Sequence, residues 1–359
     1  MKITFFIGIT FSKWLKFLTN KEIQLSIKYL FNYLIITLLS LINQVFFIPE
    51  KLFFNIKKNY RPKDPIFILG LWRSGTTLLH FLLSKDGKFC SPNNFQCIFP
   101  NTFNTMEKLF PFDVAKISAP RPQDNMTVKL NSPCEDEIAL CSLVPDYALY
   151  NFFQFTQNKE YFLNFLDFEN CEENITTHWL DEHKKFHNKV SHYYNSKRII
   201  YKSPAHSARI KKLITIYPNA SFIYIARHPL NFFQSSISSI QKLLKIMLPL
   251  QKLDIENLQE MIFTNNKRVL VRLDEDISLI PKENFSSVKY EDLVLAPTKI
   301  LSDIYSDLQL GFFNENQTEL KRYLESIKGY KTNKYEPYSS RLKNRILKEF
   351  DLYIKKWGY

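Results

Sequence analysis

Polar residues interrupt the apolar segment ILGLWRSGTTLLHFLLS at residues 68–84. They place Arg73 and the hydroxyl side chains of Ser74, Thr76 and Thr77 beside Gly75. A guanidinium and hydroxyl groups are hydrogen-bond donors suited to an anion, and glycine allows the backbone to approach that anion closely. The residue types therefore indicate a site that holds a phosphate group.

The flanking sequence indicates a strand, a loop and a helix. Residues 65–71, PIFILGL, form a short apolar run bounded by proline and glycine, which predicts a strand buried on both faces of a parallel sheet. In the following TTLLHFLLS the leucines recur at helical spacing and predict a helix. The first amide groups of a helix lack acceptors within it, so this helix would present them to an anion in the loop.

The loop differs from that of nucleoside triphosphatases. Gly70 and Gly75 keep the spacing of the G-x-x-x-x-G-K-[ST] motif, but Thr76 occupies the position of the lysine that reaches the outer phosphates. The cation has moved to Arg73. An ATPase or a kinase is therefore disfavoured, and the bound anion need not carry a metal.

A second segment, from Arg198 to Ser239, alternates two β-rich runs with two helical patterns. Such alternation predicts crossover connections and a parallel sheet, and hence an α/β fold. The second β-rich run ends at Arg227, and Ser235 follows eight residues later. A second cation and a second hydroxyl group thus follow a second strand.

The segment GLWRSGTTLL resembles the 5′-phosphosulfate loop of sulfotransferases that use 3′-phosphoadenosine 5′-phosphosulfate (PAPS), in the branch whose loop carries arginine instead of lysine. Arg227 and Ser235 match the 3′-phosphate site of that family, and the likeness extends from about Pro65 to Pro297 through YKSPAH and VKYEDLVLAP. The resemblance implies PAPS as the donor, no metal, and a cradle for the 5′ end of the donor made by Arg73, Ser74, Gly75, Thr76 and Thr77.

The resemblance also implies the fold and the organisation of the chain. We expect an α/β three-layer, P-loop-like fold with a central parallel sheet flanked by helices over residues 65–359, preceded by a helical N-terminal segment at residues 1–64. The polar stretch from Ser326 to Pro337, with Lys328, Gly329 and Tyr330, is predicted to close over the nucleotide.

Sulfuryl transfer to a hydroxyl or an amine is an in-line displacement, which needs positive charge near the leaving oxygen. Lys202, at the end of its predicted strand in YKSP, is the catalytic candidate on the leaving side, together with Arg73. The alternative for Lys202 is a solvated lysine at the end of a strand.

The acceptor also needs a base that removes its proton. The acids of SPCEDE precede an apolar helix that begins near Ile138, and SPCEDE resembles the acidic motif of one large sulfotransferase branch. The resemblance favours Glu135 as the base, with Glu137 in reserve and His206 as the competitor. Acids in this position are equally typical of a helix start, and His206 could equally be a packed core residue.

The spacing of the histidines and cysteines, the residue types that could bind a metal, indicates no metal site. His183 and His187 have helical i, i+4 spacing, but the lysines between them indicate a solvated face, as at the nearby His178. The five cysteines form no C-x-x-C pair and lie at no zinc-like spacing from histidines. We therefore expect no metal, and thiols that are reduced and packed.

The N-terminal 64 residues carry ten basic residues against three acids, in a chain of formal net charge +13. Tyr29 to Ile48 is uncharged for twenty residues, long enough to cross a bilayer. Its polar residues fall on one side of a helical projection, which favours a helix on a membrane surface or packed on its own domain over a spanning helix. Pro49 and the basic KKNYRPKDP are predicted to form a linker, and no cleaved signal peptide is expected.

The composition of the chain limits the classes of molecule that we expect it to bind. No basic stripe interleaved with aromatic residues recurs later in the chain, so nucleic acid is not expected. The segment from Phe89 to Phe168 is richer in phenylalanine and tyrosine than in acids or bases, which favours a lipid, sterol-like, phenolic or glycolipid acceptor, with carbohydrate as a further option. The basic N-terminal segment points to the cytoplasm or a membrane surface, with a Golgi-type single-pass anchor as the eukaryotic alternative.

The leading hypothesis is a PAPS-dependent sulfotransferase. The alternative is a non-catalytic nucleotide-binding or membrane-tethering protein that keeps the anion loop. The joint presence of the loop, Lys202, Arg227 and Ser235 favours the enzyme, since a scaffold has little reason to hold these residues together.

Overall fold

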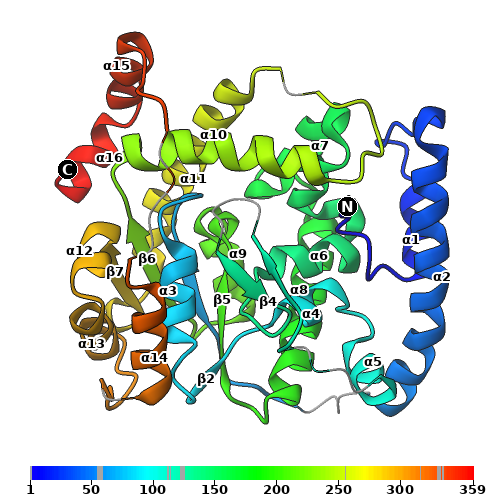
Figure 1. The fold of residues 1–359 in the computed structure, drawn as a ribbon, viewed down its shortest axis with the longest axis horizontal. Helices are drawn as coiled ribbons and strands as arrows, with labels where there is room; N and C mark the ends of the chain where they lie inside the picture. The colour runs from blue at the N-terminus through cyan, green and yellow to red at the C-terminus, as the bar shows by residue number, and fades with distance from the viewer. Residues whose placement is uncertain are drawn as a thin grey trace. The chain divides into compact units, whose positions relative to one another are not determined.

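The computed structural model describes residues 2–54, 60–110, 113, 115–121, 126–254, 256–315, 317–329, 333 and 335–359 (Figure 1). By their contacts the residues form two compact units, which we describe one at a time. The helical unit comprises Met1–Lys63, Ser91–Lys197 and Gln241–Glu256, and the sheet unit comprises Asp64–Cys90, Arg198–Ile240 and Asn257–Tyr359. The division into residues 1–64 and 65–359 stays a prediction.

A five-stranded parallel sheet forms the centre of the sheet unit. The strand order is β2-β5-β1-β6-β7, and each strand runs parallel to its neighbours. The strands are β1 (Ile66–Leu69), β2 (Phe89–Cys90), β5 (Arg198–Lys202), β6 (Ser221–Ala226) and β7 (Phe285–Lys289). Every residue of β1 and β6 is buried, as expected for central strands covered on both faces. The predicted α/β fold with a parallel sheet is confirmed.

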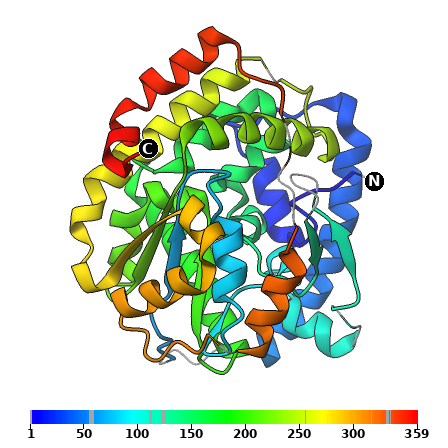
Figure 2. The same cartoon turned by 60° about the vertical axis from the view of Figure 1, so that its left-hand side comes forward.

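Helices cover both faces of this sheet. Successive residues of a strand point to opposite sides, so neighbouring residues of β1 pack on different faces. Ile66 and Ile68 pack with leucines of α3 and with residues of α12, α13 and α14 on one face. Figure 2 shows α3 (cyan) and the orange helices in front of the sheet. Phe67 stacks between Tyr201 and Phe222 on the other face. The unit's helices are α3 (Thr76–Leu83), α9 (Ile210–Ile216), α10 (Pro229–Ile246), which continues into the helical unit, α11 (Leu258–Asp276), α12 (Tyr290–Leu295), α13 (Pro297–Asp307), α14 (Thr318–Ile327), α15 (Ser340–Glu349) and α16 (Asp351–Trp357).

The helical unit packs around buried aromatic rings. Phe6 contacts Trp14, Phe17 and Phe155 at ring-centroid distances of 5.4, 5.3 and 6.1 Å. The helices of the unit are α1 (Phe11–Leu18), α2 (Leu30–Phe53), α4 (Asn94–Ile98), α5 (Phe103–Leu109), α6 (Asp136–Leu143), α7 (Lys159–Leu163) and α8 (Glu173–Tyr193), and β3 (Ser118–Pro120) pairs antiparallel with β4 (Thr127–Lys129). Four of the five cysteines are buried, as predicted for packed thiols.

Helix α2 extends beyond its predicted end. The sequence predicts a helix that stops before Pro49, whereas α2 continues through Pro49 to Phe53. Glu50 explains the additional turn, because its buried carboxylate lies 2.6 Å from the Lys189 Nζ and accepts a 2.6 Å hydrogen bond from the Thr105 amide. The prediction that the linker starts at Pro49 is therefore wrong.

The prediction that the His178–His187 segment forms a solvated face is also wrong in part. His178 is exposed, but His183 and His187 are buried on α8. Residues four apart in a helix share a face, while the intervening Lys184 and Lys185 point elsewhere and are exposed. His183 Nε2 lies 2.9 Å from an Asp136 carboxylate oxygen, and His187 Nε2 lies 3.2 Å from the Lys63 carbonyl oxygen.

The turn between β1 and α3 requires glycine at two positions. A Cβ atom added at Gly70 would lie 2.6 Å from Ser74 Oγ and 2.9 Å from the Ile225 carbonyl oxygen. Gly75 has a φ of +102°, and an added Cβ would lie 2.2 Å from Tyr290 Cδ2. The Tyr290 ring is itself held 4.0 Å below the Arg227 guanidinium, so it cannot move without disturbing that residue.

We expect Gly75→Ala to lower the free energy of unfolding by about 2–4 kcal/mol, because it combines an unfavourable φ with a steric clash. Gly87→Ala is the matched control, since a Cβ at Gly87 meets nothing within 4 Å. That variant should stay within about 0.5 kcal/mol of the wild type. Urea unfolding measures both, and equal stability of the two variants would contradict the tight turn.

His187 should make stability depend on pH. Burial, and then the neighbouring His183, lower the pKa of His187 to about 3. In the unfolded chain a histidine has a pKa of about 6.5. Between these values the unfolded state binds more protons than the folded state, so stability falls as the pH falls from about 6.5 towards 3. His187→Gln keeps a hydrogen-bond donor for the Lys63 carbonyl group. Between pH 7, 6 and 5 the melting temperature of this variant should decline less than that of the wild type. Identical declines would show that His187 does not cause the pH dependence of stability.

Candidate active site

The predicted anion loop lies at the carboxyl edge of the sheet, between Leu69 at the end of β1 and Thr76 at the start of α3. Three contacts from other segments fix its backbone. Gly70 donates its amide to Ser207 Oγ at 2.8 Å, Ser236 Oγ donates to the Trp72 carbonyl at 3.2 Å, and Arg227 Nη1 donates to the Arg73 carbonyl at 2.7 Å. Because carbonyl groups of the loop are held by these outside donors, the loop offers the amide groups at the start of α3 to an anion.

Arg73 has an unusual backbone conformation. Its φ is +70°, in the left-handed region that costs a side-chain-bearing residue on the order of 1–2 kcal/mol. Strain of this kind persists only where the surroundings impose it, and it gathers at functional sites. In this loop the strained backbone turns the Arg73 side chain towards α10, where its Nε donates a 3.0 Å hydrogen bond to Ser235 Oγ.

The two predicted phosphate sites therefore lie together within the sheet unit. Arg227 follows β6 and Ser235 lies on the second turn of α10, and both contact Arg73 directly. The sheet explains the proximity, since β1 and β6 are parallel neighbours whose carboxyl ends meet at one edge.

Two guanidinium groups and a buried hydroxyl group thus share a small region. Partial burial lowers the pKa of Arg227 below its ordinary value, with Tyr290 and Glu291 opposing the shift. An arginine remains charged even so, and gathering positive charge away from water is costly unless an anion offsets it. The arrangement is suited to hold a ligand with more than one anionic group.

Lys202 is buried at the last position of β5, opposite Ile68 of β1. The alternative of a solvated lysine at a strand end is therefore wrong. His206 is fully buried in the turn that follows, with its ring 5.2 Å from the ring of Phe67. This setting supports the alternative of a packed core histidine over that of a base.

The three acids of SPCEDE lie at the start of α6 in the helical unit, in three different surroundings. Glu135 is half-buried and accepts a 2.6 Å hydrogen bond from the Tyr150 hydroxyl group. Glu137 is fully buried and accepts a 3.3 Å hydrogen bond from the Leu149 amide. Only Glu135 of these two candidates for the base has a side chain that solvent reaches in part.

Sequence reasoning missed the pairing of Asp136 with His183. Both side chains are fully buried, and their contact at 2.9 Å joins α6 to α8. The ring of His183 also stacks on Trp179 at a centroid distance of 5.4 Å. The available signal was the i, i+4 spacing of His183 and His187, which marks one helical face, but no pattern along the sequence names the acid opposite it.

Tyr335 lies in the stretch predicted to close over the nucleotide but was not singled out there, and it donates a 3.0 Å hydrogen bond to Ser235 Oγ. Tyr338, nearby, accepts from the Gln234 amide at 2.9 Å and donates to the Leu230 carbonyl at 2.8 Å. The end of the stretch predicted to cover the nucleotide therefore lies on α10. Tyr330 lies outside the described residues, and Lys328 forms a salt bridge with Glu325.

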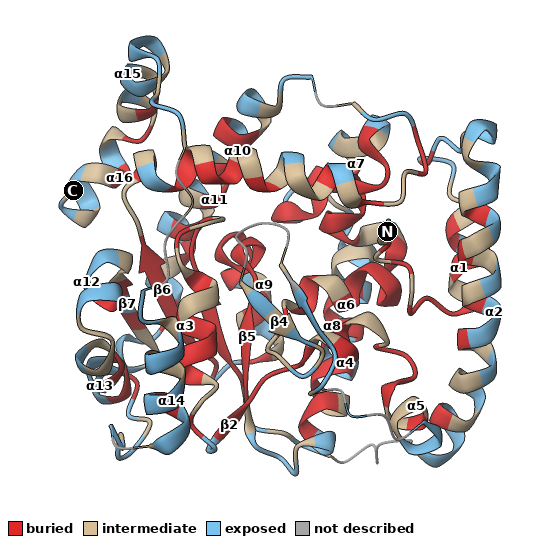
Figure 3. Ribbon diagram, viewed as in Figure 1, coloured by how far each residue is buried: buried red, intermediate tan, exposed pale blue. Residues whose placement is uncertain are grey.

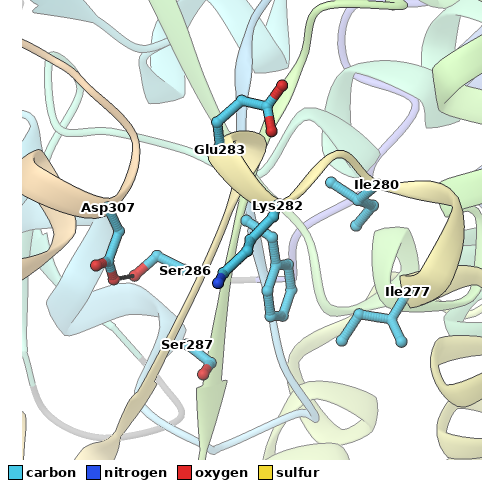
Figure 4. A pocket seen from close by; sticks show the side chains of 8 residues that line it. Ile277, Ile280, Lys282, Glu283, Ser286, Ser287 and Asp307 are labelled. Carbon is cyan, nitrogen blue, oxygen red and sulfur yellow. Dashed lines mark hydrogen bonds between the residues drawn. The ribbon is translucent and has the colours of Figure 1, made fainter.

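Figure 4 shows a pocket elsewhere in the sheet unit, where Ser286 donates a 2.7 Å hydrogen bond to Asp307. It lies at the amino end of β7, which begins at Phe285. Because β7 is parallel to β6, this is the opposite edge of the sheet from the anion loop. We therefore do not assign the donor to it. Its lining residues are Ile277, Ile280, Lys282, Glu283, Phe285, Ser286, Ser287 and Asp307.

Comparison with known proteins assigns the chain to a family. The model of the Sulfotransferase family matches residues 65–315. The chain is 30% identical over 334 residues to the omega-hydroxy-beta-dihydromenaquinone-9 sulfotransferase Stf3 of Mycobacterium bovis and to that of Mycobacterium tuberculosis, covering 92% of this chain and 85% of each relative.

Two solved structures share the fold at low sequence identity. Sulfotransferase STF9 from Mycobacterium avium superimposes with a TM-score of 0.61 at 16% identity, covering 86% of this chain and 79% of its own. Sulfotransferase STF1 from Mycobacterium tuberculosis gives the same TM-score and identity, with 88% of both chains covered. The family match and the curated relatives show that this chain belongs to the sulfotransferase family.

Proposed function

We propose that this sulfotransferase takes its sulfuryl group from PAPS and transfers it to a hydroxyl group of a lipid-type acceptor. The observation that carries the donor assignment is the hydrogen-bonded set of Arg73, Arg227 and Ser235. PAPS carries anionic groups at its 5′ and 3′ positions, and the set supplies a cation for each. Membership of an enzyme family sets aside the alternative of a non-catalytic tethering protein.

The proposed roles follow from the chemistry of the displacement. The acceptor oxygen forms a bond to sulfur as the bond from sulfur to the bridging phosphate oxygen breaks, and the electron pair of that bond stays on the leaving 3′-phosphoadenosine 5′-phosphate. Arg73 and Lys202 stabilise the negative charge that develops on the leaving oxygen. The loop residues Ser74, Gly75, Thr76 and Thr77 hold the 5′-phosphate, and Arg227 and Ser235 hold the 3′-phosphate.

We propose Glu135 as the base that takes the acceptor proton. Glu135 is half-buried, and the Tyr150 hydroxyl group orients its carboxylate through the 2.6 Å hydrogen bond. Glu137 is less suited to the role because its carboxylate is sealed from solvent and holds a backbone amide. His206 is less suited because its ring packs against Phe67 in the core.

A lipid-type acceptor is supported by a relative and by composition. The name of Stf3 assigns that enzyme an omega-hydroxy-beta-dihydromenaquinone-9 as its acceptor. The aromatic segment from Phe89 to Phe168 of this chain is consistent with an acceptor of that kind, with phenolic and glycolipid molecules as the other options. Residues 1–64 would bring the enzyme to a membrane surface from the cytoplasm; a Golgi anchor gains no support from these bacterial relatives.

Nucleotide binding tests the donor assignment. At a concentration 100 times its Kd, 3′-phosphoadenosine 5′-phosphate should stabilise the protein by about 2.7 kcal/mol, visible as a raised melting temperature, and ATP with magnesium should stabilise it much less. Ser235→Ala should weaken the response to the first nucleotide. Ser287→Ala is the matched control, because Ser287 lies in the pocket at the opposite edge of the sheet. A response that follows Ser287 instead of Ser235 would move the donor to that pocket.

Substitution of the acids tests the base. With PAPS and a hydroxylated lipid, Glu135→Gln should lower kcat by about 10²–10⁴-fold, the usual contribution of a positioned base. The shift in melting temperature with 3′-phosphoadenosine 5′-phosphate should persist, since Glu135 is not part of the donor site. Glu173→Gln, an exposed change at the start of α8, is the control. Near wild-type turnover in Glu135→Gln, with a loss in Glu137→Gln, would transfer the role to Glu137.

A further inference from the structure

One face of α2 is apolar and exposed along the whole helix (Figure 3). Its residues recur every three or four positions, so they form one continuous stripe, which we call the outer face of α2. An apolar surface of this length exceeds the scattered apolar residues of an ordinary protein surface and marks an interaction site. The outer face consists of Leu30, Phe31, Leu34, Leu38, Leu41, Ile42, Val45, Ile48, Leu52 and Phe53, each between 42% and 77% exposed.

Neighbouring segments of the helical unit extend this apolar surface at both ends of α2. Leu25 and Ile27 are exposed immediately before the helix, and Ile27 is 90% exposed. Leu109 and Phe110 are exposed at the end of α5, where the Phe110 ring lies 5.7 Å from that of Phe46. The surface is therefore broader than a single helix.

The opposite face of α2 is polar and is fixed to the helical unit by hydrogen bonds. Tyr33 donates its hydroxyl group to the Leu250 carbonyl at 2.8 Å, and Asn32 donates to the Pro249 carbonyl at 2.8 Å. Asn43 donates to the Ile9 carbonyl at 3.1 Å. The prediction allowed a helix packed on its own domain, and the structure adds that the packed face is the polar one.

Thr37 and Glu50 also fix α2 to the helical unit, in their case through side chains of other helices. Thr37 Oγ1 accepts a 2.9 Å hydrogen bond from the Trp14 indole, and Glu50 forms its buried ion pair with Lys189 of α8. If α2 crossed a bilayer with lipid on all sides, these polar groups would lose their partners in a medium that offers none. Within the described residues α2, with the preceding turn, is nevertheless the one helix long and apolar enough to span.

Charge identifies the surface that the outer face fits. Lys28 precedes α2 and Lys51 lies in its last turn, and both are exposed, whereas the helix's one acid, Glu50, is buried on the opposite face. Lys16 and Lys21 before the helix, and Lys108 of α5, are also exposed. Lysines beside an apolar stripe are typical of helices that lie in the interface of an anionic bilayer.

We infer that the outer face of α2 docks flat on a membrane surface that carries anionic lipids, so that the chain is attached to one leaflet and does not cross the bilayer. This inference deepens the membrane association included in the proposed function, but it does not depend on the donor or on the base. A second copy of the chain and a spanning arrangement are the competing occupants, and each predicts a different result below.

The test uses the full-length chain and sedimentation with vesicles of phosphatidylcholine, with or without phosphatidylglycerol. The wild type should sediment with the anionic vesicles and should be released by carbonate at pH 11. Leu38→Glu combined with Val45→Glu should reduce sedimentation at least ten-fold. The control, Leu295→Glu combined with Leu352→Glu, changes two leucines of the sheet unit that are more exposed than Leu38 and Val45, and it should bind as the wild type does.

Three results would overturn the inference. The first is that the protein stays on the vesicles after carbonate treatment, which requires a spanning helix, and the second is that the wild type and the α2 variant bind vesicles equally. The third is that the wild type forms a dimer which the α2 substitutions disrupt without any change in vesicle binding. Sulfuryl transfer from PAPS to a short, water-soluble alcohol in the absence of vesicles separates this inference from the proposed function. The α2 variant should keep that activity, whereas a failure of the donor assignment would abolish it in every variant, the wild type included.

Discussion

The hydrogen bond from the Arg227 guanidinium to the Arg73 carbonyl joins residues 154 positions apart, and the anion site depends on it. It exists because β1 and β6 are adjacent parallel strands, so that the loops after them leave the sheet at one edge. The same guanidinium lies over the Tyr290 ring, and that ring occupies the space which a side chain at position 75 would need. A small number of contacts thus fixes the loop, its glycine and both arginines together.

The residues proposed for the chemistry differ in the kind of structure that carries them. The sheet unit supplies the cations, each placed by the end of a strand: Arg73 after β1, Lys202 on β5 and Arg227 after β6. The acids lie on the helical unit at the start of α6, where the helix dipole favours negative charge. Their neighbours distinguish them, because Asp136 pairs with His183, Glu137 holds a backbone amide, and the half-buried Glu135 accepts a hydrogen bond from the Tyr150 hydroxyl group.

Helix α2 reverses the usual pattern of an amphipathic helix. It turns Tyr33, Ser40, Asn43 and Glu50 towards the protein and leaves leucine and phenylalanine outside. Burying polar groups is favourable only when each finds a partner, which the carbonyl groups of Ile9 and Leu250 and the side chain of Lys189 provide. An enzyme that acts on lipids gains from such a surface, because its acceptor is concentrated in the membrane.

Local patterns in the sequence were enough to predict the strand, glycine turn and helix around Arg73, the parallel sheet, the packed thiols and the polar side of α2. Each follows from the spacing of residues that are close in the chain. Long-range contacts decided the rest. Lys189, far along the chain, keeps α2 helical beyond Pro49; Asp136 gives the buried His183 a partner; and Tyr335 reaches Ser235 from a distant segment. Such pairings leave no periodic signal, since only the folded chain brings the two partners within hydrogen-bonding distance.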